Sequence, residues 1–274
     1  MNICFIGGGN MATALIGGLL KRDFTAAQLR VVDIDTANRE RLKSIYGVLV
    51  FEEQDRQAIE GCDVVVLAVK PTQIKDVAIQ LGPLLSGQIV LSIAAGIRLA
   101  DLARWLAIPD SNYILVRAMP NTPALVGAGI TGLYSFPKLT EQQREHIETI
   151  MSAVGSFVWI RSEEDMDAVT AISGSGPAYF FYFIEALELA GKKLGLSEQT
   201  ARKLALETAF GAAKLAHEST EDPATLRARV TSKNGTTEKA LLSLSANHVA
   251  EHIEQAARAA AARSREMGDE LGKS

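Results

Sequence analysis

Short apolar runs alternate with stretches of helical periodicity from the start of the chain to about Ser162. The runs are rich in valine and isoleucine and predict strands at Asn2–Ile6, Leu29–Asp33, Val48–Phe51, Val64–Val69, Ile89–Ile93 and Tyr113–Met119. Between most of them, apolar residues recur every three or four positions and predict helices at Met11–Arg22, Ala37–Tyr46, Thr72–Leu84 and Leu99–Leu106. Nearly continuous apolar strands are typical of sheets with both faces covered. The alternation predicts an α/β fold with a parallel, doubly wound sheet.

The pattern changes after about Ser162. Two last strands are predicted at Gly127–Tyr134 and Phe157–Ile160, on either side of a helix at Glu141–Val154. Beyond them the periodicity is helical, with long helices predicted at Tyr179–Leu194, Ser197–His217 and Asn247–Met267. Asp222 followed by Pro223 indicates an N-cap with proline at the first helical position. We therefore expect two domains, an N-terminal one over residues 1–162 and an all-helical one over residues 163–274.

The composition of the 274 residues is that of an ordinary globular protein, with 47% apolar and 22% charged residues. A net charge of −4 lacks the basic excess of nucleic-acid-binding proteins, so no nucleic-acid partner is expected. Cys4 and Cys62 lie beside apolar runs and match no disulfide framework or zinc motif. The first residues lack a signal-peptide pattern, and no run approaches the roughly 18 apolar residues of a membrane helix. We expect a cytoplasmic protein without a membrane partner.

The segment Gly7–Ala12 reads Gly-Gly-Gly-Asn-Met-Ala and fits the G-x-G-x-x-A form of the dinucleotide-binding fingerprint. It follows the first predicted strand and opens the first predicted helix, which is the context that the fingerprint requires. Gly7 permits the tight turn, and Gly9 lets the backbone approach a pyrophosphate. The helix N-terminus then offers free N–H groups to the phosphates. The loop predicts a Rossmann domain that binds NADH or NADPH, and a glycine-rich turn without a ligand is the alternative.

The end of the second predicted strand bears on the choice between the two cofactors. It reads Val-Asp-Ile-Asp and contains Asp33 and Asp35. An acid here can bind the ribose hydroxyls and would repel a 2′-phosphate, whereas Arg39 and Arg41 follow only on the next helix. The pattern favours NADH, unless Asp33 only caps the following element.

Three loops follow predicted strands and are therefore expected at one edge of the sheet. Small residues in these loops let a nicotinamide ribose lie close, and prolines end the strands. The loops are Ala68–Pro71, Ser92–Gly96 and Ala118–Pro123, and any one of them alone could be a plain turn. Within them we expect the cofactor to contact Ala68, Val69, Lys70, Pro71, Ala95, Met119 and Pro120.

Two segments rich in glycine and hydroxyl groups interrupt the helical half, Ile172–Tyr179 and Thr231–Glu238. Each leads into a predicted helix. Free N–H groups at a helix start, next to serine or threonine hydroxyls, suit a small carboxylate. Ordinary N-capping accounts equally well for either segment alone.

Six motifs together resemble the Δ1-pyrroline-5-carboxylate reductase family. They are IGGGNM, AVKP, SIAAG, RAMPNTPA, SGSGPAY and SKNGTT, in order from Ile6 to Thr237. The resemblance implies reduction of Δ1-pyrroline-5-carboxylate to L-proline by hydride from NADPH or NADH, the last step of proline biosynthesis. It also implies a Rossmann domain followed by a helical domain that forms an interleaved homodimer, with dimers often assembling into rings. A related cyclic imine as substrate stays open.

The resemblance assigns roles residue by residue. For the cofactor it adds Ile6, Gly7, Gly8, Gly9, Asn10 and Met11 at the pyrophosphate, and Asp55 at the adenosine end beside Asp33. For the substrate carboxylate it implies backbone N–H groups and hydroxyls of Ser232, Asn234, Gly235, Thr236 and Thr237. Thr237 matches the position that hydrogen-bonds the ring nitrogen, which makes it the candidate catalytic residue and proton relay.

Two departures from the family pattern matter. Asn234-Gly235 stands where two glycines are common, and asparagine tolerates a positive φ well enough for the turn to survive. Many relatives that prefer NADPH carry Ser or Asn with a nearby Arg after the second strand. This chain has Asp33-Ile34-Asp35 there, which agrees with the preference for NADH.

Three other interpretations are weaker. His248–His252 spells H-x-x-E-H, a zinc-protease motif with both histidines on one helix face, but a third ligand and a cleft are missing, so no metal is expected. A β-hydroxyacid dehydrogenase needs a catalytic lysine on the helix after Gly176, where Pro177–Phe180 contains none. A non-catalytic dinucleotide sensor has no need of the loop at Ser232–Thr237.

Overall fold

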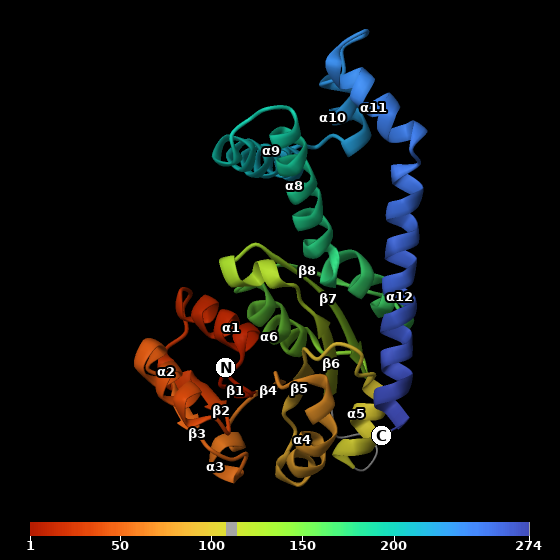
Figure 1. The fold of residues 1–274 in the computed structure, drawn as a ribbon. Helices are drawn as coiled ribbons and strands as arrows, with labels where there is room; N and C mark the ends of the chain where they lie inside the picture. Colours follow the sequence, from red (N-terminus) through yellow and green to blue (C-terminus); the bar gives the residue numbers. More distant parts are fainter. Residues whose placement is uncertain (108–113, 274) are drawn as a thin grey trace. The chain divides into compact units, whose positions relative to one another are not determined.

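The computed structural model describes residues 1–107 and 114–273. In this part of the chain eight strands form one sheet, in the order β3-β2-β1-β4-β5-β6-β7-β8 (Figure 1). The strands are β1 Ile3–Ile6, β2 Leu29–Val32, β3 Leu49–Phe51, β4 Val64–Leu67, β5 Ile89–Ser92, β6 Ile114–Met119, β7 Gly129–Phe136 and β8 Gly155–Trp159. Every predicted strand is confirmed, apart from Tyr113, which lies outside the described residues.

The strands from β3 to β6 run parallel, in the order typical of a Rossmann fold, which confirms the predicted fold class. The exception to the predicted parallel sheet is β7, which pairs antiparallel to β6. Only a short connection with one 3-10 turn, Thr122–Val126, joins these two strands. A parallel crossover needs a dozen or more residues, so the chain turns back instead. α6 (Glu141–Ser152) then provides the crossover that returns β8 parallel to β7.

Helices cover both faces of the sheet because alternate strand residues point to opposite sides. Ile3 and Phe5 face a core shared with α1 (Asn10–Leu20), α2 (Thr36–Tyr46) and α6. Cys4 and Ile6 face a second core, which is shared with α3 (Arg56–Ile59), α4 (Ile74–Leu81) and α5 (Leu99–Leu106). Figure 1 shows these helices around the sheet.

The chain after β8 is helical, as predicted. Its helices are α7 Met166–Val169, α8 Gly176–Lys193, α9 Glu198–Glu218, α10 Pro223–Arg229, α11 Thr236–Ala246 and α12 Val249–Lys273. The predicted cap before α10 is confirmed, since Asp222 Oδ1 accepts a hydrogen bond of 3.0 Å from the Thr225 amide. None of the described helices combines the length and apolar character that crossing a bilayer requires.

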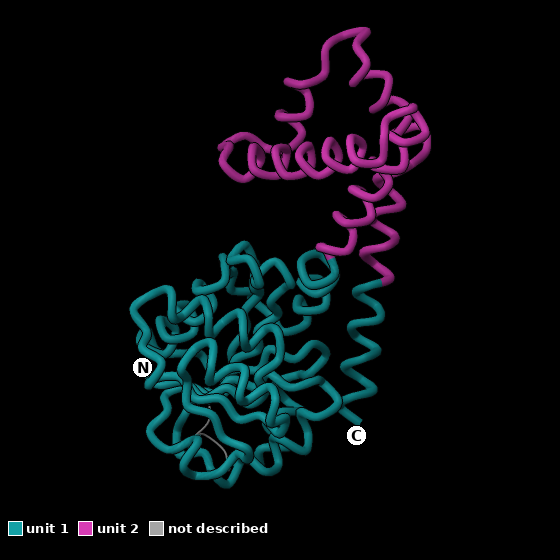
Figure 2. The backbone as a smooth tube through the Cα atoms, turned by 60° about the vertical axis from the view of Figure 1, so that its left-hand side comes forward, with its two compact units in different colours: residues 1–175, 260–274 teal, residues 176–259 magenta. Residues whose placement is uncertain are grey.

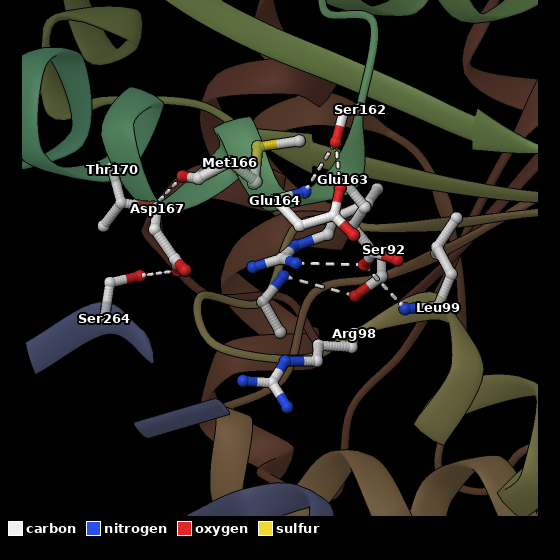
Figure 3. A network of polar contacts seen from close by, with 12 residues as sticks. Ser92, Arg98, Leu99, Ser162, Glu163, Glu164, Met166, Asp167, Thr170 and Ser264 are labelled. Atoms are coloured by element: carbon white, nitrogen blue, oxygen red, sulfur yellow. Dashed lines mark hydrogen bonds and ion pairs between the residues drawn. The ribbon is translucent and has the colours of Figure 1, made fainter. Parts of the chain in front are cut away.

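Two compact units make up the described chain, residues 1–175 with 260–274 and residues 176–259 (Figure 2). The last turns of α12 therefore belong to the unit that contains the sheet. Ser264 Oγ donates a hydrogen bond of 2.7 Å to Asp167 Oδ1 of α7 (Figure 3). Arg98 forms an ion pair of 2.7 Å with Asp269 of α12. The first contact joins α12 to α7, and the second joins α12 to the residue that precedes α5.

A buried ion pair lies at the start of the helical segment. Arg117 of β6 and Glu163 are 2.9 Å apart, with 6% and 21% of their side chains exposed. Glu163 Oε1 also accepts a hydrogen bond of 2.8 Å from the amide of Leu99, the first residue of α5 (Figure 3). One carboxylate thus satisfies a buried guanidinium and an otherwise free amide at a helix N-terminus.

Candidate functional site

A cavity of about 760 Å³ lies at the carboxyl ends of β1, β2, β3 and β4. Its location is where parallel α/β sheets bind ligands, beside the point at which the strand order reverses between β1 and β4. The described residues that line it are Ile6, Gly7, Gly8, Gly9, Val32, Asp33, Ile34, Asp35, Glu52, Glu53, Gln54, Ala68, Val69, Lys70, Gln73, Val77 and Gln80.

The glycine loop has the shape that the fingerprint predicts. Gly7 has a φ of 100°, and a Cβ built there would lie 2.8 Å from the Ala68 carbonyl oxygen, so the turn accepts only glycine. A Cβ built on Gly9 would meet no described atom within 4 Å. The space above Gly9 is therefore an open cradle next to the start of α1, where a diphosphate fits.

The first amides of α1 are available to an anion. Gly9 is the N-cap residue, and no described side chain caps this end of the helix. Asn10 and Met11 form the first turn, so their backbone N–H groups belong to the free N-terminus although their side chains do not line the cavity. The residues present thus fit the pyrophosphate of a dinucleotide.

The Asp33 carboxylate is held beside the glycine loop. Its Oδ2 accepts hydrogen bonds from the Gly8 amide at 2.8 Å and from Asn38 Nδ2 at 2.6 Å. Its Oδ1 accepts one from the Asp35 amide at 2.9 Å. The cap of α2 is instead Asp35, whose Oδ1 accepts from the amides of residues 37 and 38. Asp33 therefore does not serve only as a helix cap.

The other expected cofactor residues divide into two groups. Ala68, Val69 and Lys70 line the cavity, and Pro71 begins the 3-10 turn that follows them. Outside the described lining lie Asp55, Ala95, Met119 and Pro120. The Asp55 carboxylate caps α3 through the Ala58 amide at 2.8 Å. A Cβ built on Gly174 would lie 2.5 Å from Met119 Cε, so the Met119 side chain packs directly over that glycine.

Several lining residues were missed by the sequence analysis. Glu52, Glu53 and Gln54 follow β3, while Gln73, Val77 and Gln80 come from α4 and the turn before it. The first group had a signal, because the residues after every parallel strand reach the same edge of the sheet. The second group had none, since the side of α4 that faces the cavity depends on how the helix packs.

The loop Ser232–Thr237 has a fixed backbone. Asn234 has a φ of 62°, which confirms that asparagine sustains the turn, and its amide donates a hydrogen bond of 2.8 Å to Glu238 Oε2. Gly235 is the N-cap of α11 and lacks a side-chain cap, so the amides of Thr236 and Thr237 belong to a free helix start. A Cβ on Gly235 would lie 2.4 Å from Ser232 Oγ and 3.0 Å from the Ser232 carbonyl oxygen, so a larger residue would displace the Ser232 side chain.

The other segment predicted to interrupt the helices does not do so. Thr170–Gly174 forms a π-helical turn that connects α7 to α8, with the Ser175 amide bonded to the Thr170 carbonyl oxygen at 2.8 Å. One serine hydroxyl supports it, because Ser173 Oγ donates a hydrogen bond of 2.9 Å to the Val169 carbonyl oxygen. Asn121 Nδ2 donates to the Ser173 carbonyl oxygen at 3.1 Å, which ties the turn to the loop after β6.

The H-x-x-E-H segment differs from its predicted form. His248 has a φ of 53° and precedes α12, so it does not share a helix face with His252. Its ring instead lies 3.4 Å from Glu251 Oε1. Over residues 1–107 and 114–273, no three His, Cys, Asp or Glu side chains are grouped to hold a metal ion.

Known proteins match the chain over nearly its whole length. Residues 163–267 match the family model described as pyrroline-5-carboxylate reductase dimerisation, and residues 2–96 match the model for coenzyme F420-dependent NADP oxidoreductase. A pyrroline-5-carboxylate reductase of Pseudomonas aeruginosa is 47% identical over 272 residues, which are 99% of this chain and 98% of the relative.

Two solved structures extend the comparison. A pyrroline-5-carboxylate reductase from Coxiella burnetii has a TM-score of 0.91 and 40% identity, covering 97% of this chain and 98% of that one. The Plasmodium falciparum pyrroline carboxylate reductase, solved with NADP bound, has a TM-score of 0.84 and 30% identity, with 98% of both chains covered.

Proposed function

The chain belongs to the pyrroline-5-carboxylate reductase family, and we propose that the cavity and the loop Ser232–Thr237 carry out its reaction. The enzyme reduces the C=N bond of Δ1-pyrroline-5-carboxylate to give L-proline, the last step of proline biosynthesis, with NADPH or NADH as cofactor. The observation that carries the assignment of the cofactor site is the open cradle above Gly9, between a positive-φ glycine and an uncapped helix start.

The cavity residues bind and orient the dinucleotide. Bound nicotinamide supplies the hydride for the ring carbon of the imine. The amides at the start of α1 hold the pyrophosphate, and Asp33 binds the adenosine ribose. Ala68, Val69 and Lys70 of the cavity lining shape the nicotinamide side together with Pro71, Ala95, Met119 and Pro120. Asp55 contacts the adenosine end.

The loop Ser232–Thr237 binds the substrate carboxylate. Two features support this role: the free amides of Thr236 and Thr237 at the start of α11, and the hydroxyls of Ser232 and Thr236, both exposed residues. The positive φ of Asn234 and the missing Cβ of Gly235 shape the turn that presents these groups.

Thr237 orients the ring nitrogen or relays a proton to it. A threonine hydroxyl is a poor acid, so it acts by hydrogen bonding to a protonated imine or through water. Most of the rate enhancement then comes from holding the reactants in line.

The test is the initial rate of NADH and NADPH oxidation with Δ1-pyrroline-5-carboxylate. Thr237→Ala should lower kcat by about a hundredfold, the usual effect of a lost proton relay, while Thr237→Ser retains most of it. Thr236→Ala should mainly raise the KM for the imine. Thr231→Ala is the matched control, since the Thr231 hydroxyl is bonded to the Arg227 carbonyl oxygen. Full turnover by Thr237→Ala would exclude its catalytic role.

We further propose residues 1–162 as the cofactor domain and residues 163–274 as the substrate and dimerisation domain. The dimerisation family model supports this division because its match starts at residue 163. The compact units differ from it since residues 163–175 and 260–274 pack on the sheet unit.

The assembly is proposed to be a homodimer that forms rings of dimers. Large apolar side chains of α8 and α9 stay exposed in the single chain, including Phe180, Phe181, Tyr182, Leu204 and Phe210. Exposed clusters of this kind mark interaction surfaces. Light scattering should give a multiple of the dimer mass, and a monomer would contradict the proposal. We also propose a cytoplasmic location, which agrees with the free thiols of both cysteines.

A further inference from the structure

Glu52 is the neighbour of Asp33 at the rim of the cofactor cavity. Val32 pairs with Phe51 in the parallel ladder, and the Asp33 amide donates to the Phe51 carbonyl oxygen at 3.1 Å. The next residue on each strand therefore projects at the same edge, about one strand spacing apart. Glu52 is well exposed there, with 72% of its side chain accessible.

The Arg39 guanidinium contacts Glu52 and already has two other partners. Its Nη1 donates to the Asp33 carbonyl oxygen at 2.7 Å, and its Nη2 donates to Thr36 Oγ1 at 3.0 Å. Nη2 also lies 3.4 Å from Glu52 Oε2 in an ion pair. Only 12% of the Arg39 side chain is exposed, so its position is fixed by these partners.

Arg39 is not among the described residues that line the cavity, but its guanidinium pairs with Glu52, which is. Without that glutamate, a guanidinium this close to the rim can bind a phosphate. Arginine presents several N–H donors in a planar fork that matches phosphate oxygens. In Rossmann domains the residue after β2 contacts the ribose hydroxyls, and a nearby arginine accommodates the 2′-phosphate of NADPH. Glu52 neutralises this arginine and adds its own charge to those of Asp33, Asp35 and Glu53 around the cavity.

We propose that this chain binds NADH in preference to NADPH and that Glu52 is a specificity-determining residue that sets this preference by pairing with Arg39. The inference deepens the proposed function and rests on it. Two effects act together. The Glu52 carboxylate repels the 2′-phosphate, and it also pairs with Arg39, which contacts the Asp33 carbonyl oxygen and the Thr36 hydroxyl. The preference thus depends on the end of β3 as well as on the acid after β2.

The chain offers a matched control in Glu53. Glu53 lines the same cavity and carries the same charge, and the ion pair of Arg39 is made by Glu52. Glu52→Gln removes both the charge and the pairing, whereas Glu53→Gln removes a charge alone. The difference between the two variants therefore isolates the release of Arg39.

The experiment measures dissociation constants of NADH and NADPH from nicotinamide fluorescence, without imine, so the readout is independent of turnover. Glu52→Gln should raise the affinity for NADPH relative to that for NADH by about tenfold, which is the effect of a new charge-assisted hydrogen bond to the phosphate. Glu53→Gln should change the ratio by about threefold at most, as expected for a screened charge.

Two further arms test the role of Arg39. Raising the salt from about 0.05 M to about 0.5 M shortens the Debye length, so it should erase the effect of Glu53→Gln and leave most of that of Glu52→Gln. Adding Arg39→Met to Glu52→Gln should remove the gain in NADPH affinity, because that gain requires the Arg39 guanidinium. The effects of the two substitutions should therefore not add.

The outcomes separate the inference from the proposed function. Equal shifts for both glutamine variants, no shift for Glu52→Gln, or a gain that survives Arg39→Met would each overturn the role of Glu52. Folded protein that binds neither dinucleotide and shows no turnover would instead overturn the proposed cofactor site.

Discussion

The backbone amide of Gly8 donates a hydrogen bond of 2.8 Å to Oδ2 of Asp33, 25 residues further along the chain. This bond joins the turn after β1 to the turn after β2. A Cβ built on Gly8 would lie 3.0 Å from the same oxygen and 2.5 Å from Leu42 Cδ1. The absence of a side chain at Gly8 thus lets the carboxylate approach the loop, while the open space above Gly9 is left for a ligand.

The first prediction separates stability from binding within the glycine loop. Gly8→Ala should lower the free energy of unfolding by about 1–3 kcal/mol, because its Cβ meets Leu42 and Asn38 Nδ2 at less than contact distance. Gly9→Ala should change it by no more than about 1 kcal/mol, the scale of an N-cap substitution. Its NADH affinity should nevertheless fall by about tenfold or more, since the methyl group fills the diphosphate cradle.

Urea denaturation and nicotinamide fluorescence measure the two quantities on the same samples. Unchanged NADH affinity in a folded Gly9→Ala protein would show that the diphosphate lies elsewhere.

The second prediction concerns the charge of Asp33. Asp33→Asn should lower the affinity for NADH by about tenfold, because a charged hydrogen-bond acceptor for the ribose is lost. The affinity for NADPH should fall less, because the repulsion between Asp33 and the 2′-phosphate is lost as well. Asp35→Asn is the control, since Asp35 caps α2 and asparagine caps a helix as well as aspartate does. Dissociation constants for both cofactors decide the matter. Similar effects of the two variants would contradict a ribose contact by Asp33.

The third prediction concerns the buried pair of Arg117 and Glu163. Arg117→Met should lower the free energy of unfolding by about 2–4 kcal/mol, because the largely buried Glu163 carboxylate then keeps, among the described residues, the Leu99 amide as its one partner. Arg258→Met, which breaks an exposed pair with Glu254, should cost less than about 1 kcal/mol. Denaturant titration compares them, and equal losses would mean that burial adds nothing to the Arg117 pair.

The fourth prediction is a loss of stability at alkaline pH. Burial, and next the nearby Cys62 thiol, raise the pKa of the Cys4 thiol far above its ordinary value of 9.0. Above that pH the Cys4 thiol loses its proton in the unfolded state and keeps it in the folded state. Deprotonation therefore stabilises the unfolded state relative to the folded one. Each such thiol should reduce the free energy of unfolding by about 1.4 kcal/mol per pH unit above about pH 9.

Cys4→Ala supplies the comparison for that slope. Its free energy of unfolding should fall less steeply than that of the parent protein between about pH 9 and about pH 11. Parallel curves for the two proteins would rule out an ionisation of Cys4 as the cause.

The strands, the phosphate loop and the turn at Asn234 could be predicted because local chemistry decides them. Valine-rich runs form strands wherever both faces are covered, and a positive φ at Gly7 or Asn234 requires a residue that tolerates it. The carboxyl ends of parallel strands meet at one edge of a sheet, which predicts that Asp33 and Ala68–Lys70 lie together, and they line one cavity.

The amino-acid sequence by itself determined the Rossmann architecture, the cofactor loop and the family, since these depend on short segments whose residue types have few alternatives. Tertiary structure alone decided the direction of β7, the return of Ser264 to Asp167 and the ion pair between Arg39 and Glu52. Each of these joins segments that are far apart in sequence or face each other only after the sheet forms. Their energies depend on packing and burial, which no local pattern of residues encodes.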